Sequence, residues 1–220
     1  MFESTLHELE NRIKKAIWRP GDRLPTLPNL AAELNVSIST LREVLRILES
    51  RNLITIEQGR GTFVRTDIVS QDRGSLHFLK QLFEARTLLE PYLASMAATR
   101  GLREEIEEIA VAAQKHKTSV ERRQDFTDED IAFHLNIAKA AHNTVLLKMF
   151  QGLIEQLRVS RLYTNLIPGM IEKSLHYHLM IADALQNRDS ERAMALMKSH
   201  MDDVSYELNH MEAAPTEVVK

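Results

Sequence analysis

Three histidines in the second half of the sequence, His134, His178 and His200, recur with aliphatic residues at spacings of three and four. That spacing puts each histidine on the apolar face of its own predicted helix, and such a face is normally buried. A buried imidazole needs a hydrogen-bond partner or a cation, because an unpaired polar group inside a protein costs free energy. A carbonyl or hydroxyl group could satisfy each ring separately, whereas one shared cation would satisfy all three.

Asp130 precedes His134 by four residues, so the two side chains lie one helical turn apart. Taken alone, this pair is typical of a metal site, an acid/base pair or a surface ion pair. Together with His178 and His200 it supplies one oxygen and three nitrogen donors. Such a set suits a divalent Zn²⁺, Ni²⁺, Fe²⁺ or Mn²⁺ ion, and the usual order of affinities does not choose among them. From spacing alone, a metal site and ordinary core histidines stay open as alternatives.

The other histidines have weaker patterns. His176 competes with His178 as a ligand, but its helical face is mixed rather than apolar. The remaining five are expected to be exposed or partly packed: His7, His77, His116, His142 and His210.

Arg86 also lies in an apolar stripe, between Phe83 and Leu93, with Glu90 one helical turn away. A buried ion pair between Arg86 and Glu90 is one interpretation. The other is a guanidinium directed into a pocket, where it could hold a carboxylate through two hydrogen bonds.

Several chemistries are excluded by composition. The chain has no cysteine, so disulfides, thiolate metal ligands and a cysteine nucleophile are ruled out. It has no H-E-x-x-H motif, and Glu90 is the only candidate base, so a metal-dependent hydrolase or lyase is the weaker alternative. The first residues lack the apolar segment of a signal peptide, and no apolar run reaches the length of a membrane span. We therefore expect a cytoplasmic protein that has no membrane partner.

The sequence predicts mostly helical secondary structure around these residues. The chain of 220 residues is 44% hydrophobic and has only 7 glycines and 6 prolines, which favours a mainly α fold. In the second half, helices are predicted at 76–100, 103–120, 126–141, 144–166, 170–187 and 189–211.

The first 66 residues have a different pattern. A helix at 4–17 and a short helix around Leu30 precede a third helix at about 38–50, for which Ser37 is a suitable N-cap. Two β-branched runs then flank "QGRG", in which Gly59 and Gly61 permit a hairpin turn. This order predicts a winged helix-turn-helix, although a generic helical hairpin is the alternative.

The boundaries follow from these patterns. We expect a winged helix-turn-helix at 1–66, a polar linker at 67–75, an all-α six- or seven-helix bundle at 76–212 and a frayed tail at 213–220. Residues 1–66 hold 10 basic and 8 acidic side chains in a chain whose net charge is −3, so the positive charge that DNA binding needs is local and small.

The stretch "WRPGDRLPTLPNLAAELNVSISTLREVLRILESRNLITIEQGRGTFV" resembles the DNA-binding domain of GntR-type bacterial transcription regulators. The second half is similar to the helical ligand domain of their FCD branch, in the segments "LFEARTLLEPYLASMAA", "DIAFHLNIAKAAHN", "HLMIADALQNRD" and "MKSHM". The resemblance covers nearly the whole chain, and the linked order of the segments makes it specific.

This resemblance implies particular roles. Asp130, His134, His178 and His200 would bind a divalent metal, and Arg86 with the metal would hold a small organic-acid effector. A homodimer would bind a palindromic double-stranded DNA operator. The residues at the positions that contact DNA in the family are Ser37, Ser39, Thr40, Arg42, Gln58, Gly59 and Arg60.

Two departures from the family pattern concern the operator sequence. The family usually has Ser-Glu-Arg after "LP", where this chain has Thr26, Leu27 and Pro28. It usually has an arginine after "VS", where this chain has Ile38. Losing an arginine that pairs with guanine removes roughly 1–3 kcal/mol of base discrimination, although an isoleucine could contact a thymine methyl group. The alternative is that Ile38 packs inside its own domain.

The expected function is a transcription regulator whose operator binding responds to an effector at the metal site, by a shift between two populations of conformations. A regulator that senses the metal itself is the alternative. The branch of the family that binds acyl-CoA without a metal is not favoured, because this chain keeps all four ligands.

Overall fold

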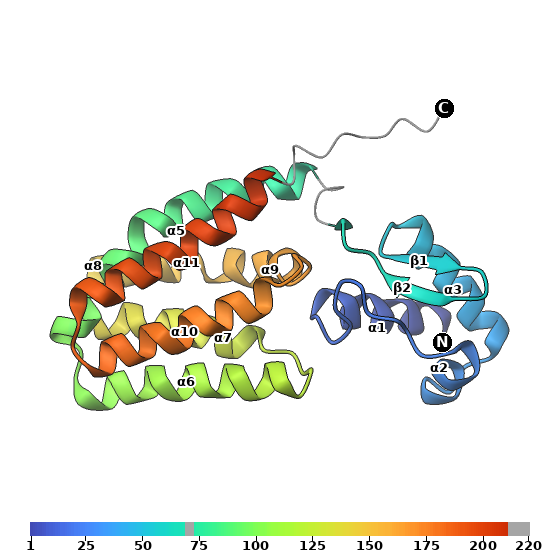
Figure 1. Cartoon of the computed structure of the whole chain (residues 1–220), viewed down its shortest axis with the longest axis horizontal. Coiled ribbons are helices and arrows are strands. Elements are labelled where there is room, and N and C mark those ends of the chain that lie inside the picture. Colours follow the sequence, from blue (N-terminus) through green and yellow to red (C-terminus); the bar gives the residue numbers. More distant parts are fainter. Residues whose placement is uncertain (69–72, 211–220) are drawn as a thin grey trace.

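The computed structural model describes residues 1–68 and 73–210, and most of these residues are helical. Figure 1 shows a small N-terminal part, which carries the only two strands among them, beside a larger bundle of helices. The mainly α fold expected from the sequence is confirmed. Part of the expected linker, 69–72, and the expected tail, 213–220, lie outside the described residues.

The N-terminal part is built from three helices and a hairpin. These are α1 (Phe2–Lys14), α2 (Leu27–Glu33), α3 (Ile38–Ser50), β1 (Ile54–Glu57) and β2 (Gly61–Val64). The Ser37 hydroxyl accepts a hydrogen bond of 3.0 Å from the Thr40 amide and thereby caps α3. The strands pair antiparallel, and Gly59 in the turn between them has a positive φ of 76°. The helix–turn–helix and its wing are therefore confirmed.

The C-terminal part has seven helices within the described residues. They are α5 (Arg73–Arg100), α6 (Arg103–Glu121), α7 (Thr127–Ala140), α8 (Thr144–Gln151), α9 (Ile154–Thr164), α10 (Met170–Gln186) and α11 (Ser190–His210). Five of them form a closed ring, in which α5 packs on α11, α11 on α10, α10 on α6, α6 on α7 and α7 on α5. Figure 1 shows α5 and α11 side by side along most of their length, with α10, α7 and α6 below them.

The single helix predicted at 144–166 is wrong, because the chain breaks there into α8 and α9. Gly152 ends α8, and the Leu153 amide bonds to the Phe150 carbonyl three residues back rather than to the carbonyl four residues back. Glycine has the lowest helix propensity after proline, so it is a natural place for the break. The break changes the direction of α9 and allows it to reach the polar centre of the bundle.

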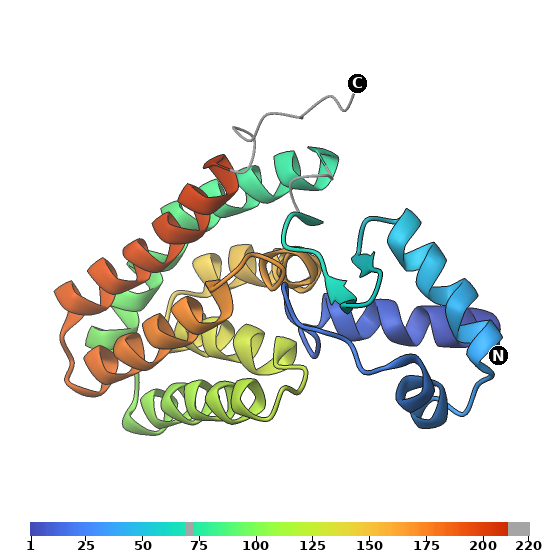
Figure 2. The same cartoon turned by 45° about the vertical axis from the view of Figure 1, so that its right-hand side comes forward.

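The two parts touch at the end of α1. Lys15 and Asp125 form an ion pair of 2.8 Å, and Arg123 pairs with Asp22. Arg19 donates a hydrogen bond of 3.1 Å to the Val120 carbonyl. The buried apolar contact beside these pairs consists of Ala16, Val120, Phe126 and Ile171, with Leu175 against it. In Figure 2 the blue chain after α1 meets the ends of α6, α7 and α10 at this contact.

Candidate metal centre

The interior of the helical ring holds an unusual cluster of polar side chains. Each of the five ring helices contributes at least one, and α9 contributes another. They are Arg86 and Glu90 on α5, His116 on α6, Asp130 and His134 on α7, Arg161 on α9, His178 on α10 and His200 on α11. All eight residues are at most 2% exposed, so their polar atoms need partners inside the protein rather than in solvent.

Three of the four residues expected to bind a metal, His134, His178 and His200, come together in this cluster, and Asp130 lies beside His178. His134, His178 and His200 each offer one nitrogen atom within 4.8 Å of the others. The Nε2 atoms of His178 and His200 are 3.2 Å apart, and Oδ1 of Asp130 is 3.8 Å from Nε2 of His178. Ligand atoms about 2.0–2.2 Å from one ion lie roughly 3–3.5 Å from each other. The contact between His178 and His200 fits a shared divalent cation, whereas Asp130 lies within 4.8 Å of His116 and His178 but not of all three proposed histidine ligands.

Only one of the two carboxylate oxygens of Asp130 has a charged partner close by. Its Oδ2 atom lies 2.6 Å from Nε of Arg161, whereas Oδ1 has no hydrogen-bond partner among the described residues. Burial by itself would raise the pKa of Asp130, but the charge of Arg161 and the nearby rings hold the pKa below its ordinary value. A buried, ionised carboxylate with a free oxygen beside three imidazoles is the feature that a cation would satisfy.

Two of the proposed histidine ligands, His178 and His200, are held in the neutral form. Burial lowers the pKa of His178 and of His200 well below the usual value, and the neighbouring rings add to this effect. Both rings are therefore neutral near pH 7, as a metal ligand must be. The effect of burial also lowers the pKa of His116 to about 4.

Glu90 connects His134 to Arg86. Its Oε2 atom lies 2.6 Å from Nδ1 of His134, and its Oε1 atom accepts a bond of 2.5 Å from Nε of Arg86. Burial tends to raise the pKa of Glu90, but Arg86 and His134 outweigh it and hold the pKa far below its ordinary value. A carboxylate on Nδ1 leaves Nε2 of His134 to face the cation, as in many metal sites.

The ion-pair interpretation of Arg86 is confirmed, and its role toward an effector stays a prediction. It makes the buried ion pair with Glu90, yet its Nη2 atom lies 3.4 Å from Nε2 of His134, the nitrogen that faces the centre. Its Nη1 atom has no hydrogen-bond partner among the described residues. The guanidinium therefore has donors left for a further ligand.

Two members of the cluster were not expected from the sequence. His116 was expected to be exposed or partly packed, and this is wrong because its side chain is fully buried. Its spacing from Ile109, Ala112 and Val120 is the same signal that identified His178. Arg161 also lies on a buried stripe, with Leu157. By contrast, these histidines are exposed: His7, His77, His142, His176 and His210.

The expected DNA contacts lie together on the N-terminal part. Ser37, Ser39, Thr40 and Arg42 lie at the start of α3, and Gln58, Gly59 and Arg60 form the tip of the wing. All of them are exposed except Thr40, which is half-buried.

Ile38 is 43% exposed at the first turn of α3, which is the second helix of the helix–turn–helix. The interpretation that this side chain packs inside its domain is therefore wrong. It is instead available to a partner on the same surface as Arg42.

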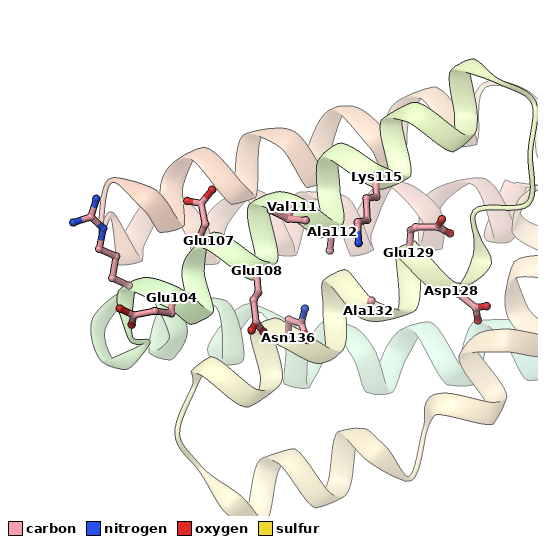
Figure 3. Close-up of a pocket in the computed structure, with 11 residues that line it drawn as sticks. Glu104, Glu107, Glu108, Val111, Ala112, Lys115, Asp128, Glu129, Ala132 and Asn136 are labelled. Carbon is pink, nitrogen blue, oxygen red and sulfur yellow. The ribbon is translucent and has the colours of Figure 1, made fainter.

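A surface groove of about 850 Å³ between α6 and α7 is a separate feature (Figure 3). It contains none of the eight buried residues. Five carboxylates and two basic side chains line it. Their excess of negative charge does not suit an acidic effector, so the buried cluster is the better candidate.

Comparison with known proteins agrees with this architecture. Residues 3–64 match the family model "Bacterial regulatory proteins, gntR family", and residues 81–203 match the FCD domain. The chain therefore belongs to the gntR family of bacterial regulators and carries an FCD domain. It is a DNA-binding transcription regulator and not an enzyme.

Individual relatives cover most of the chain. The chain is 27% identical over 209 residues to the Uxu operon regulator of Haemophilus influenzae, covering 91% of this chain and 79% of that one. It is 30% identical over 206 residues to the regulator LutR of Bacillus subtilis, covering 87% and 94%. A solved GntR structure from Streptococcus agalactiae shares the fold, with a TM-score of 0.54, 24% identity and coverage of 94% and 99%. Across residues 1–68 and 73–210, no helix has both the length and the apolar character needed to cross a membrane.

Proposed function

We propose that this regulator binds its operator under the control of a small carboxylate effector, which is held at a divalent metal ion inside the helical ring. The observation that carries the proposal is the convergence of three buried histidines, His134, His178 and His200, with the free oxygen of the buried Asp130 3.8 Å from Nε2 of His178. Asp130, His134, His178 and His200 would hold the ion. When bound, the ion would supply coordination positions for the oxygen atoms of the effector.

The charges of the cluster support an anionic effector. The fixed charges are Arg86 and Arg161 against Glu90 and Asp130, so they cancel. A divalent cation would therefore leave about two uncompensated positive charges in a buried site, which is costly unless an anion accompanies it. Arg86 would hold one carboxylate of that anion, because Nη1 is without a partner among the described residues and Nη2 faces the centre.

The depth of the cluster favours a second candidate, in which the metal itself is the signal. All four proposed ligands are at most 2% exposed, so a bare ion needs less rearrangement than an organic acid. In this case the affinity for the operator follows the free metal concentration when no carboxylate is present. In the first case it changes only when both are present.

The proposed partner of the N-terminal DNA-binding part is a palindromic operator, which a homodimer would bind. Two copies of α3 would read half-sites about one DNA turn apart. Exposed apolar side chains on the helical part suit an interface between two copies. They include Leu88 and Tyr92 on α5 and Val145 and Met149 on α8. The mass of the protein in solution tests this interface, and a strictly monomeric protein that still binds a palindrome contradicts it.

The decisive experiment measures operator binding against both signals. A duplex selected from random sequences is titrated with metal-free protein, zinc-loaded protein, and zinc-loaded protein with a panel of small mono- and dicarboxylates. The proposal predicts that at least one carboxylate changes the operator affinity of the zinc-loaded form and has no effect on the metal-free form. An equal effect on both forms contradicts a role for the metal.

A further inference from the structure

His116 lies against the far side of the ring of His178. The Nδ1 atoms of the two rings are 3.0 Å apart, and both side chains are fully buried. Nε2 of His178, on the opposite side of its ring, faces His200 at 3.2 Å and Asp130 at 3.8 Å. His178 thus stands between His116 on α6 and the proposed ligands on the other helices.

The position of one proton follows from this arrangement. A neutral imidazole carries a proton on only one nitrogen, and the nitrogen that binds a cation must carry none. If Nε2 of His178 binds the metal, its proton is on Nδ1, and at 3.0 Å that proton can only be directed at Nδ1 of His116. Nδ1 of His116 must then be the acceptor.

We propose that His116 is a positioning residue, which accepts the Nδ1–H of His178 and so keeps Nε2 of His178 turned toward the metal. This inference rests on the metal centre proposed above. Glu90 lies in a comparable place at His134, with its Oε2 atom 2.6 Å from Nδ1 of His134. Partners of this kind fix the tautomer and the orientation of a metal-binding histidine.

The surrounding rings hold the pair in place. His116 stacks on Phe126 with 4.8 Å between ring centroids, and His178 stacks on Phe133 at 4.1 Å. Phe126 also belongs to the apolar contact with Ala16 of the N-terminal part. A chain of contacts therefore runs from His178 through His116 to Phe126, which also packs against the N-terminal part.

His116 could instead be a ligand itself, since it lies with Asp130 and His178 in a second group of donors within 4.8 Å. However, its Nδ1 meets Nδ1 of His178, and the two nitrogens of one imidazole point in diverging directions. An ion at Nε2 of His178 is out of reach of that atom. A second ion at Nδ1 would require His178 to lose its one remaining ring proton and become an imidazolate.

The test compares two variants of the full-length protein, with zinc as the probe. His116→Leu keeps the volume but removes the acceptor, whereas His116→Asn keeps an acceptor near the position of Nδ1. Zinc affinity, measured by competition with a chelator, should fall about 10–100-fold in His116→Leu and less than about threefold in His116→Asn. The matched control His142→Leu, at an exposed histidine, should bind zinc as the wild type does.

Equal affinities of wild type and His116→Leu would overturn the inference, as would equal losses in both His116 variants. Complete loss of zinc binding in both His116 variants, as expected for His134→Ala, would instead show that His116 is itself a ligand. A wild type that binds no zinc would instead refute the metal centre itself. If His116→Leu does not fold, nitrogen NMR of the zinc-loaded wild type decides. It should show a proton on Nδ1 of His178 and none on Nδ1 of His116, and the reverse pattern refutes the inference.

Discussion

Nε of Arg161 lies 2.6 Å from Oδ2 of Asp130, and this ion pair is sealed in the centre of the helical ring. The two residues come from α9 and α7, and α9 is a separate helix because the chain breaks after α8. The pair leaves the other oxygen of Asp130 directed at the histidines. Asp130, His134 and His178 thus each have an outer partner, and these partners can be tested separately from the ligands.

Removal of Arg161 should destabilise the metal-free protein more than the metal-loaded one. Arg161→Leu leaves Asp130 buried without its counter-charge, which should cost about 3–5 kcal/mol of unfolding free energy. A bound cation would replace part of that charge, so zinc should raise the melting temperature of the variant by more than that of the wild type. Equal zinc-induced shifts in the two proteins would contradict the assignment of Asp130 as a ligand.

Neutralisation of Glu90 should weaken metal binding without removing a ligand. In Glu90→Gln the contact with Nδ1 of His134 loses its charge, so zinc affinity should fall about 10–100-fold while the stoichiometry stays the same. Calorimetric titration with zinc measures both quantities. The control is Glu84→Gln, at an exposed position on the same helix, which should leave both unchanged. An unchanged affinity in Glu90→Gln would show that Glu90 serves only Arg86.

Acid should destabilise the metal-free protein through its buried histidines. Their pKa values are lowered in the folded state, to about 4 for His116, so the unfolded chain binds more protons below pH 6.5. Stability should therefore be fully present above about pH 6.5 and fall as the pH drops from there toward 4. Denaturant titrations at several pH values measure this slope. His116→Asn should reduce the slope of the unfolding free energy against pH by about 1.4 kcal/mol per pH unit. The control His7→Asn, at an exposed histidine, should leave this slope unchanged.

Ile38 should control one position of each operator half-site. Its side chain is exposed at the start of α3, where an arginine could pair with a guanine. Ile38→Arg should therefore change the preferred base there by roughly 1–3 kcal/mol, as measured by selection of binding sites from random duplexes. Arg60→Ala at the wing tip is the control, because it should lower the affinity for all sequences alike. An identical selected sequence for wild type and Ile38→Arg would refute the role.

The ion pair between Arg123 and Asp22 should affect operator binding more than stability. Surface pairs contribute only about 0–1 kcal/mol to folding, but this one joins the N-terminal part to the turn between α6 and α7. Arg123→Asp should change the affinity for the operator with little change in melting temperature. Adding Asp22→Arg to it should restore much of the original affinity. If the double variant behaves as Arg123→Asp alone, the contact is not used in this way.

Much of the fold could be predicted because it rests on local patterns. The cap at Ser37, the turn at Gly59 and the stripes around His178 and His200 are each set by residues near in sequence. The partners of the ligands are different, because Arg161 approaches Asp130 only through the break after α8. His116 had the right spacing, but only the packing of α6 against α10 brings it to His178.

The metal content of the purified protein is the sharpest test of the proposed divalent-metal centre. Elemental analysis after extensive dialysis should find about one divalent ion per chain in the wild type, and far less in Asp130→Ala and His200→Ala. The exposed control His176→Ala should keep the ion. A wild type without metal, whose Asp130→Ala and His200→Ala variants have the same melting temperature as the wild type, would contradict the account.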